Sequence, residues 1–140
     1  MTDKIFRFSI PLEVRFGDID AFGHVNHAVF FTFFEQSRSE YVIRLGLPAL
    51  MPSDLNFILA EATCSYKAPI FYGTPLEVKT RVEHMGRSSF RMGHQIEDRS
   101  THQILAVGHS ILVVYDYHQN KSVPMPIDWR AAIEKFEAGQ

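Results

Sequence analysis

The apolar residues recur with two different periods along the chain, one typical of a helix and one typical of strands. Between residues 27 and 45 the apolar side chains recur at helical spacing, at Phe30, Phe33, Phe34, Tyr41 and Leu45. Val29, Phe31 and Val42 extend the apolar surface well around the same segment. We therefore expect a long helix over residues 27–45, with Asn26 as its N-cap and with other structure wrapped around most of it.

The rest of the hydrophobic pattern has a period of two and predicts strands on both sides of this helix. We expect strands at about residues 8–15, 57–67, 76–83, 89–97 and 104–115. In the second strand we expect one face to carry Ile58, Ala60, Ala62, Cys64 and Tyr66. A short helix is expected at 128–137. Successive strands with one segregated helix indicate an α+β fold in a single domain over residues 1–140, in which the sheet curls around the long helix.

Composition narrows the classes of protein that this chain can be. The net charge is -2, so no basic surplus favours nucleic acid. The single cysteine, Cys64, excludes an intramolecular disulfide and makes a thiolate zinc site within the chain implausible; we expect it to pack in the core. We find neither a secretory signal nor an apolar run long enough to span a membrane, so we expect a cytoplasmic enzyme or binding domain.

The densest group of polar side chains lies just before the long helix, at Asp18, Asp20, His24, Asn26 and His27. Polar groups against an apolar helix cost free energy unless they are paired, so this cluster is a candidate functional site. A solvated loop with an N-cap is the simpler alternative, because charged loops before helices are common. The two His and two Asp residues also leave a metal site open as a minor alternative.

The run from Phe16 to Asn26 resembles the signature of the 4-hydroxybenzoyl-CoA thioesterase family of hotdog proteins. That signature is Asp-x-Asp-x-x-Gly-His-Val-Asn, followed by an aromatic-rich helix with a Glu and an Arg, here Glu35 and Arg38. Further matches follow in order at Tyr66–Pro69, Tyr72–Gly73 and Gly86–Phe90. The resemblance implies a hotdog fold, in which an antiparallel sheet wraps a long helix. It also implies a homodimer or homotetramer with active sites at the dimer interface, and no metal or cofactor.

The same resemblance assigns roles to the polar cluster. Asp20 matches the catalytic carboxylate, which either attacks the thioester carbonyl or activates a water. The backbone N–H of His27, at the N-terminus of the helix, matches the donor that polarises the carbonyl. His24 and Asn26 could orient Asp20 or a water. For Asp18 we expect a structural role, accepting hydrogen bonds from backbone N–H groups of the loop.

Two further sites are candidate substrate contacts. Arg87, with Ser88 and Ser89, matches the hairpin where relatives contact the nucleotide end of coenzyme A, although a turn arginine can equally be ordinary surface. Glu35 matches the helix carboxylate that one branch of hotdog thioesterases uses in catalysis. Its i,i+3 spacing from Arg38 favours a structural ion pair instead.

We therefore expect an enzyme that hydrolyses an acyl-CoA thioester to a free acid and coenzyme A. A thioesterase acting on acyl carrier protein, a hotdog hydratase and a non-catalytic acyl-CoA-binding protein are the alternatives. The residues leave open the length of the acyl group and whether it is aromatic or aliphatic.

Overall fold

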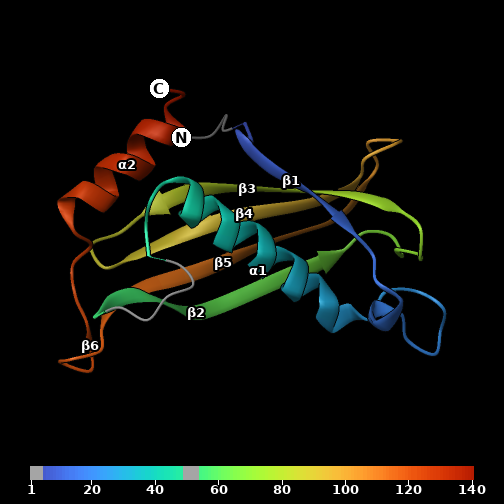
Figure 1. Ribbon diagram of the computed structural model, residues 1–140, viewed down its shortest axis with the longest axis horizontal. Coiled ribbons are helices and arrows are strands. Elements are labelled where there is room, and N and C mark those ends of the chain that lie inside the picture. The colour runs from blue at the N-terminus through green and yellow to red at the C-terminus, as the bar shows by residue number, and fades with distance from the viewer. Residues whose placement is uncertain (1–4, 49–53) are drawn as a thin grey trace.

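The computed structural model describes residues 5–48 and 54–140, which form one antiparallel sheet and two α-helices (Figure 1). In chain order the elements are β1 (Phe8–Glu13), a 3₁₀ turn (Phe16–Asp18), α1 (His27–Arg44), β2 (Leu55–Tyr66), β3 (Pro75–Met85), β4 (Ser89–Asp98), β5 (Ile104–Asp116), β6 (Lys121–Ser122) and α2 (Ile127–Glu137). The predicted elements are confirmed to within two residues at nearly every end. The two shortest elements, the 3₁₀ turn and β6, were missed, because two or three residues are too few to show a period.

The strands are ordered β1-β3-β4-β5-β2, and β6 pairs with the end of β5. All of these pairs are antiparallel. Figure 1 shows α1 lying diagonally across one face of the sheet, with its first turn beside the end of β2 and its later turns beside β3 and β1. The predicted α+β hotdog arrangement is confirmed. Among the described residues, neither helix has the length and hydrophobicity that crossing a bilayer requires.

The core lies between α1 and the inner face of the sheet. On α1 the buried apolar residues are Phe30, Phe33, Phe34, Tyr41 and Val42. They meet the inner face of β3, where the alternation predicted a buried row, confirmed at Leu76, Val78, Thr80 and Val82. The helix is covered less completely than the sequence predicted: Val29 and Phe31 are only half-buried and Ile43 is 48% exposed. In one chain the curved sheet covers one side of α1 and leaves the other open.

The prediction of which β2 side chains share a face is wrong for the first half of the strand, because the strand contains a β-bulge. The pairing with β5 shifts register between Leu59 and Glu61, so Ala60 is the extra residue. Residues opposite each other in an antiparallel pair share a face, and a bulge moves every later side chain to the other side. Ile58 therefore lies on the outer face, whereas Ala62 and Cys64 lie on the inner face, across from Ser110 and Gly108.

Candidate active site

Asp18 holds together the loop that leads into α1. Its side chain is 1% exposed, accepts the backbone N–H of Arg15 at 2.8 Å and pairs with the Arg15 guanidinium at 2.7 Å. Burial alone would raise the pKa of Asp18, but the hydrogen bonds and charge of Arg15 lower that pKa below its ordinary value. The Asp18 carbonyl also accepts the Asn26 N–H at 2.9 Å. The predicted structural role is confirmed.

Asp20 lies in a tight turn two residues further on. Its backbone N–H donates to the His24 carbonyl at 3.0 Å, and its carbonyl accepts the Gly23 N–H at 3.0 Å. Gly23 has a φ of +88°, which favours glycine at the point where the chain reverses. One carboxylate oxygen accepts the Phe22 N–H at 2.9 Å. The other has no hydrogen-bond partner in the described part of the chain, so it is available to a ligand.

The first turn of α1 provides a candidate hydrogen-bond donor, seven residues along the chain from Asp20. Asn26 is the N-cap, as predicted: its side-chain oxygen accepts the Ala28 N–H at 2.9 Å, and its carbonyl accepts the Val29 N–H at 2.9 Å. No acceptor for the His27 N–H is found within residues 5–48 and 54–140. This donor sits at the positive end of the helix dipole, where a developing negative charge is stabilised.

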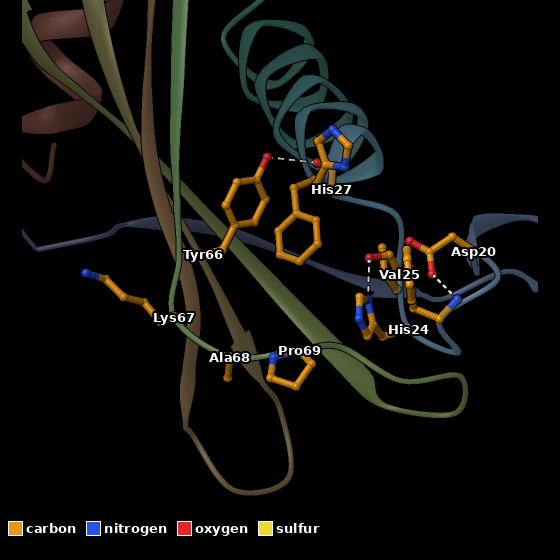
Figure 2. Close-up of a pocket in the computed structure, with 10 residues that line it drawn as sticks. Asp20, His24, Val25, His27, Tyr66, Lys67, Ala68 and Pro69 are labelled. Atoms are coloured by element: carbon orange, nitrogen blue, oxygen red, sulfur yellow. Dashed lines mark hydrogen bonds between the residues drawn. The ribbon is translucent and has the colours of Figure 1, made fainter.

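A cavity of about 500 Å³ opens between the loop, the start of α1 and the end of β2 (Figure 2). Its lining residues are Asp20, Phe22, His24, Val25, His27, Phe30, Tyr66, Lys67, Ala68 and Pro69. The Tyr66 hydroxyl donates to the His27 carbonyl at 3.0 Å, and its ring packs edge-on against Phe30 at 4.8 Å. The sequence placed Tyr66 on a strand and in a matching motif, but not among the site residues. Its position beside the first turn of α1 follows from the pairing of β2 with β5.

The structure brings together three of the four predicted catalytic residues at this cavity. Asp20, His24 and His27 line it, whereas Asn26 lies behind it as the helix cap. The half-buried His24 ring stacks on Phe22 at 6.3 Å, with Nδ1 3.4 Å from the Val25 carbonyl. These contacts hold the ring at the cavity wall. Within the described residues, no group of three His, Cys, Asp or Glu side chains is arranged to hold a metal ion.

The predicted substrate contacts lie elsewhere in the single chain. Arg87, Ser88 and Ser89 form the β3–β4 hairpin. That hairpin lies at the end of the sheet opposite the cavity, because β3 starts near the cavity and runs for 11 residues, or about 36 Å. Glu35 lies two turns along α1, 66% exposed, with its carboxylate 3.7 Å from the Arg38 guanidinium. The expected ion pair is present, and the substrate-binding roles stay predictions.

The model of the thioesterase-like superfamily matches residues 14–133, a segment that contains the loop, α1 and every strand after it. The chain belongs to the thioesterase-like superfamily. This confirms the resemblance at the level of the superfamily; it does not single out the 4-hydroxybenzoyl-CoA branch.

A solved structure is similar to this chain in fold, and two curated proteins are similar in sequence. A thioesterase from Thermus thermophilus, solved with coenzyme A and Zn, is 30% identical, with a TM-score of 0.83 over 95% of this chain and 96% of that one. The acyl-CoA thioester hydrolase YbgC of Escherichia coli O157:H7 is 32% identical over 64% of this chain and 66% of its own. The chain therefore spans slightly less than two thirds of that curated relative. The 1,4-dihydroxy-2-naphthoyl-CoA hydrolase of Synechococcus elongatus is 25% identical over 81% of this chain and 85% of its own.

Proposed function

We propose that this protein hydrolyses acyl-CoA thioesters, with Asp20 as the catalytic carboxylate and the His27 N–H as the donor to the thioester carbonyl. The observation that carries the proposal is their common position: the Asp20 carboxylate and the first turn of α1 open on one cavity with mostly apolar walls. Relatives named for hydrolysis of CoA thioesters, and one solved with coenzyme A, support the choice of substrate.

The geometry supports two routes with the same products. In the first, the Asp20 carboxylate attacks the thioester carbon, the oxyanion accepts the His27 N–H, and the C–S bond breaks to give a mixed anhydride and CoA thiolate. Water then hydrolyses the anhydride, which restores the carboxylate and releases the acid. In the second, Asp20 takes a proton from a water as that water attacks the carbonyl. The tetrahedral intermediate then expels the CoA sulfur, which takes up the proton from Asp20, so that the carboxylate is restored and the acid and CoA thiol are released.

Contact between the β3–β4 hairpin and a substrate at Asp20 requires a second chain. Within the described residues β2 is an outer strand of the sheet. Antiparallel pairing of two β2 strands reverses one chain relative to the other, which brings opposite ends of the two sheets together. We therefore propose a dimer through β2, in which Arg87, Ser88 and Ser89 of the partner subunit contact the nucleotide of the bound acyl-CoA. A tetramer of two such dimers stays a prediction.

Release of free CoA thiol from a panel of acyl-CoAs tests the reaction. The panel contains aliphatic esters from short to long, benzoyl-CoA and phenylacetyl-CoA. In the Asp20→Asn variant we expect kcat/KM to fall at least about 100-fold, because that variant loses the nucleophile or base. Asp128→Asn, an exposed carboxylate at the start of α2, is the matched control and should keep full activity.

Circular dichroism and binding of coenzyme A should be unchanged in Asp20→Asn. If the wild type turned over no CoA ester, the proposed function would be wrong and a carrier-protein substrate or a binding role would replace it. If Asp20→Asn kept wild-type turnover, the site assignment would be wrong, and the Glu35 carboxylate would be the next candidate.

A further inference from the structure

A chain of hydrogen-bonded polar side chains crosses the apolar core between α1 and the sheet. In order, its members are Arg38, Ser110, His94, Thr80 and Ser37, and each is at most 9% exposed. The successive distances are 3.3 Å, 2.8 Å, 3.0 Å and 2.6 Å. Buried polar groups are costly unless they are fully paired, so five of them in one continuous chain require a structural or functional reason.

The two ends of the chain and the burial of His94 together set the directions of its hydrogen bonds. Arg38 can only donate, so Ser110 accepts from it. At the other end the Ser37 hydroxyl donates to the carbonyl of Val78 at 3.4 Å, and a carbonyl can only accept. Thr80 therefore donates to Ser37 and accepts the hydrogen on Nδ1 of His94. Burial lowers the pKa of His94 to about 3, so Nε2 carries no hydrogen near neutral pH and accepts from Ser110. The chain therefore holds the Arg38 guanidinium at a fixed place inside the protein.

The guanidinium held in this way lines two cavities between α1 and β2. Their volumes are about 350 Å³ and 140 Å³, and both are also lined by Glu35 and Leu59. Arg38 carries five N–H donors, yet in the described residues its only hydrogen-bond acceptor is Ser110, and Glu35 lies 3.7 Å away. Donors that remain on a nine-tenths buried cation beside a cavity are suited to an oxygen from a ligand.

The cavities at Arg38 and the Asp20 cavity lie at different points along α1 and β2. Along α1 the 11 residues from His27 to Arg38 span about 16 Å. The larger Arg38 cavity adjoins Phe57 of β2, whereas the Asp20 cavity adjoins Tyr66. If two β2 strands pair about their midpoint, the Tyr66 end of one faces the Phe57 end of the other. That arrangement places the Arg38 cavity of one chain beside the Asp20 cavity of its partner.

We propose that Arg38 of the partner subunit recognises a neutral oxygen, a hydroxyl or a ketone, on the acyl group that is bound at Asp20. This inference rests on the proposed function and names its substrate class: acyl-CoAs with an oxygenated acyl group. A neutral oxygen fits better than a carboxylate, because the Glu35 carboxylate already balances the charge of Arg38 and would repel a second anion. A hydroxyl can also accept from Arg38 while it donates to Glu35.

Matched pairs of substrates test the recognition. We would measure kcat/KM for 4-hydroxyphenylacetyl-CoA against phenylacetyl-CoA, and for 3-hydroxyoctanoyl-CoA and 3-oxooctanoyl-CoA against octanoyl-CoA. The wild type should prefer the oxygenated member of at least one pair by about 10-fold or more, since a site with a buried donor rejects a ligand that leaves it unpaired. In Arg38→Met the ratio should fall to about 1, because the variant has no donor for the acyl oxygen.

Arg44→Met, which removes an exposed arginine from the last turn of α1, is the control and should keep the wild-type ratio. Arg38→Gln, which keeps a donor for Ser110, replaces Arg38→Met if the methionine variant does not fold. An unchanged ratio in a folded Arg38 variant, or equal rates within every pair for the wild type, would overturn the proposal. The proposed function is tested independently of this inference by measuring the loss of activity in Asp20→Asn on the apolar substrates.

Mixed dimers test whether Arg38 acts across the interface. We would co-express Asp20→Asn chains and Arg38→Met chains with different tags and purify the dimer that carries both. If Arg38 acts on the partner's site, the mixed dimer has one intact site and should turn over the oxygenated substrate at about half the wild-type rate. If its rate does not exceed that of the Arg38→Met dimer, or if the protein is monomeric, recognition across the interface is refuted.

Discussion

The buried histidine in the polar chain should make this protein lose stability in mild acid. His94 is 2% exposed, both ring nitrogens are hydrogen-bonded, and the ring stacks on Phe34 at 4.8 Å. A protonated ring would need both nitrogens to donate, so Ser110 would have to turn its hydrogen away from Nε2 and leave that hydrogen without its present acceptor. Burial, followed by the charges of Arg38 and His109, lowers the pKa of His94 from 6.5 to about 3.

The sign and size of the effect follow from this difference in pKa. Below pH 6.5 the unfolded chain binds a proton at His94 that the native protein does not bind until about pH 3. Stability therefore falls as the pH falls through this window. Between about pH 7.5 and about pH 5.5 the free energy of unfolding should drop by about 1.4 kcal/mol from this residue. The lowered carboxyl pKa values of Asp18, Glu97 and Asp98 act mainly below this window.

Urea unfolding at the two pH values, at one protein concentration, measures the drop. In His94→Gln, which keeps a donor and an acceptor, the drop should be smaller than in the wild type by about 1.4 kcal/mol, because glutamine does not titrate. His102→Gln, at an exposed position, is the control and should match the wild type. Equal drops in the wild type and in His94→Gln would show that His94 is not held neutral, and would refute the direction that we assign to the chain.

Two further predictions concern packing and assembly. In Gly108→Ala the added Cβ would meet the Thr63 carbonyl and lie 2.6 Å from the Phe34 ring, so urea unfolding should show a loss of about 1–3 kcal/mol. Gly17→Ala, where nothing lies within 4 Å, is the control, and equal losses would contradict the packing. Sedimentation velocity should show a dimer, and Ala60→Lys, at the midpoint of β2, should raise its dissociation constant at least about 10-fold through like charges that face each other. A wild-type monomer would contradict this.

The sequence by itself determined the features that depend on neighbours along the chain. The cap at Asn26 and the helical period that follows it locate α1, and the alternation in β3 identifies its buried face. The candidate site follows in the same way, because Asp20 and His27 are only seven residues apart and the intervening turn is short. Local hydrogen bonds and side-chain periods depend on residues that are close together in the sequence, so they can be predicted without knowledge of the rest of the fold.

Only the tertiary structure decided which distant segments meet. The bulge at Ala60 exists because β2 pairs with β5, and no local period shows that one residue is left out of the ladder. The helix pattern predicted Arg38 only as the partner of Glu35 in an ion pair. In the structure Arg38 also donates a hydrogen bond to Ser110, 72 positions away, and so joins the buried polar chain. Such contacts depend on how strands pair across the sheet. Residue spacing therefore indicated the loop that carries the candidate site, whereas strand pairing determined which distant side chains pack around it.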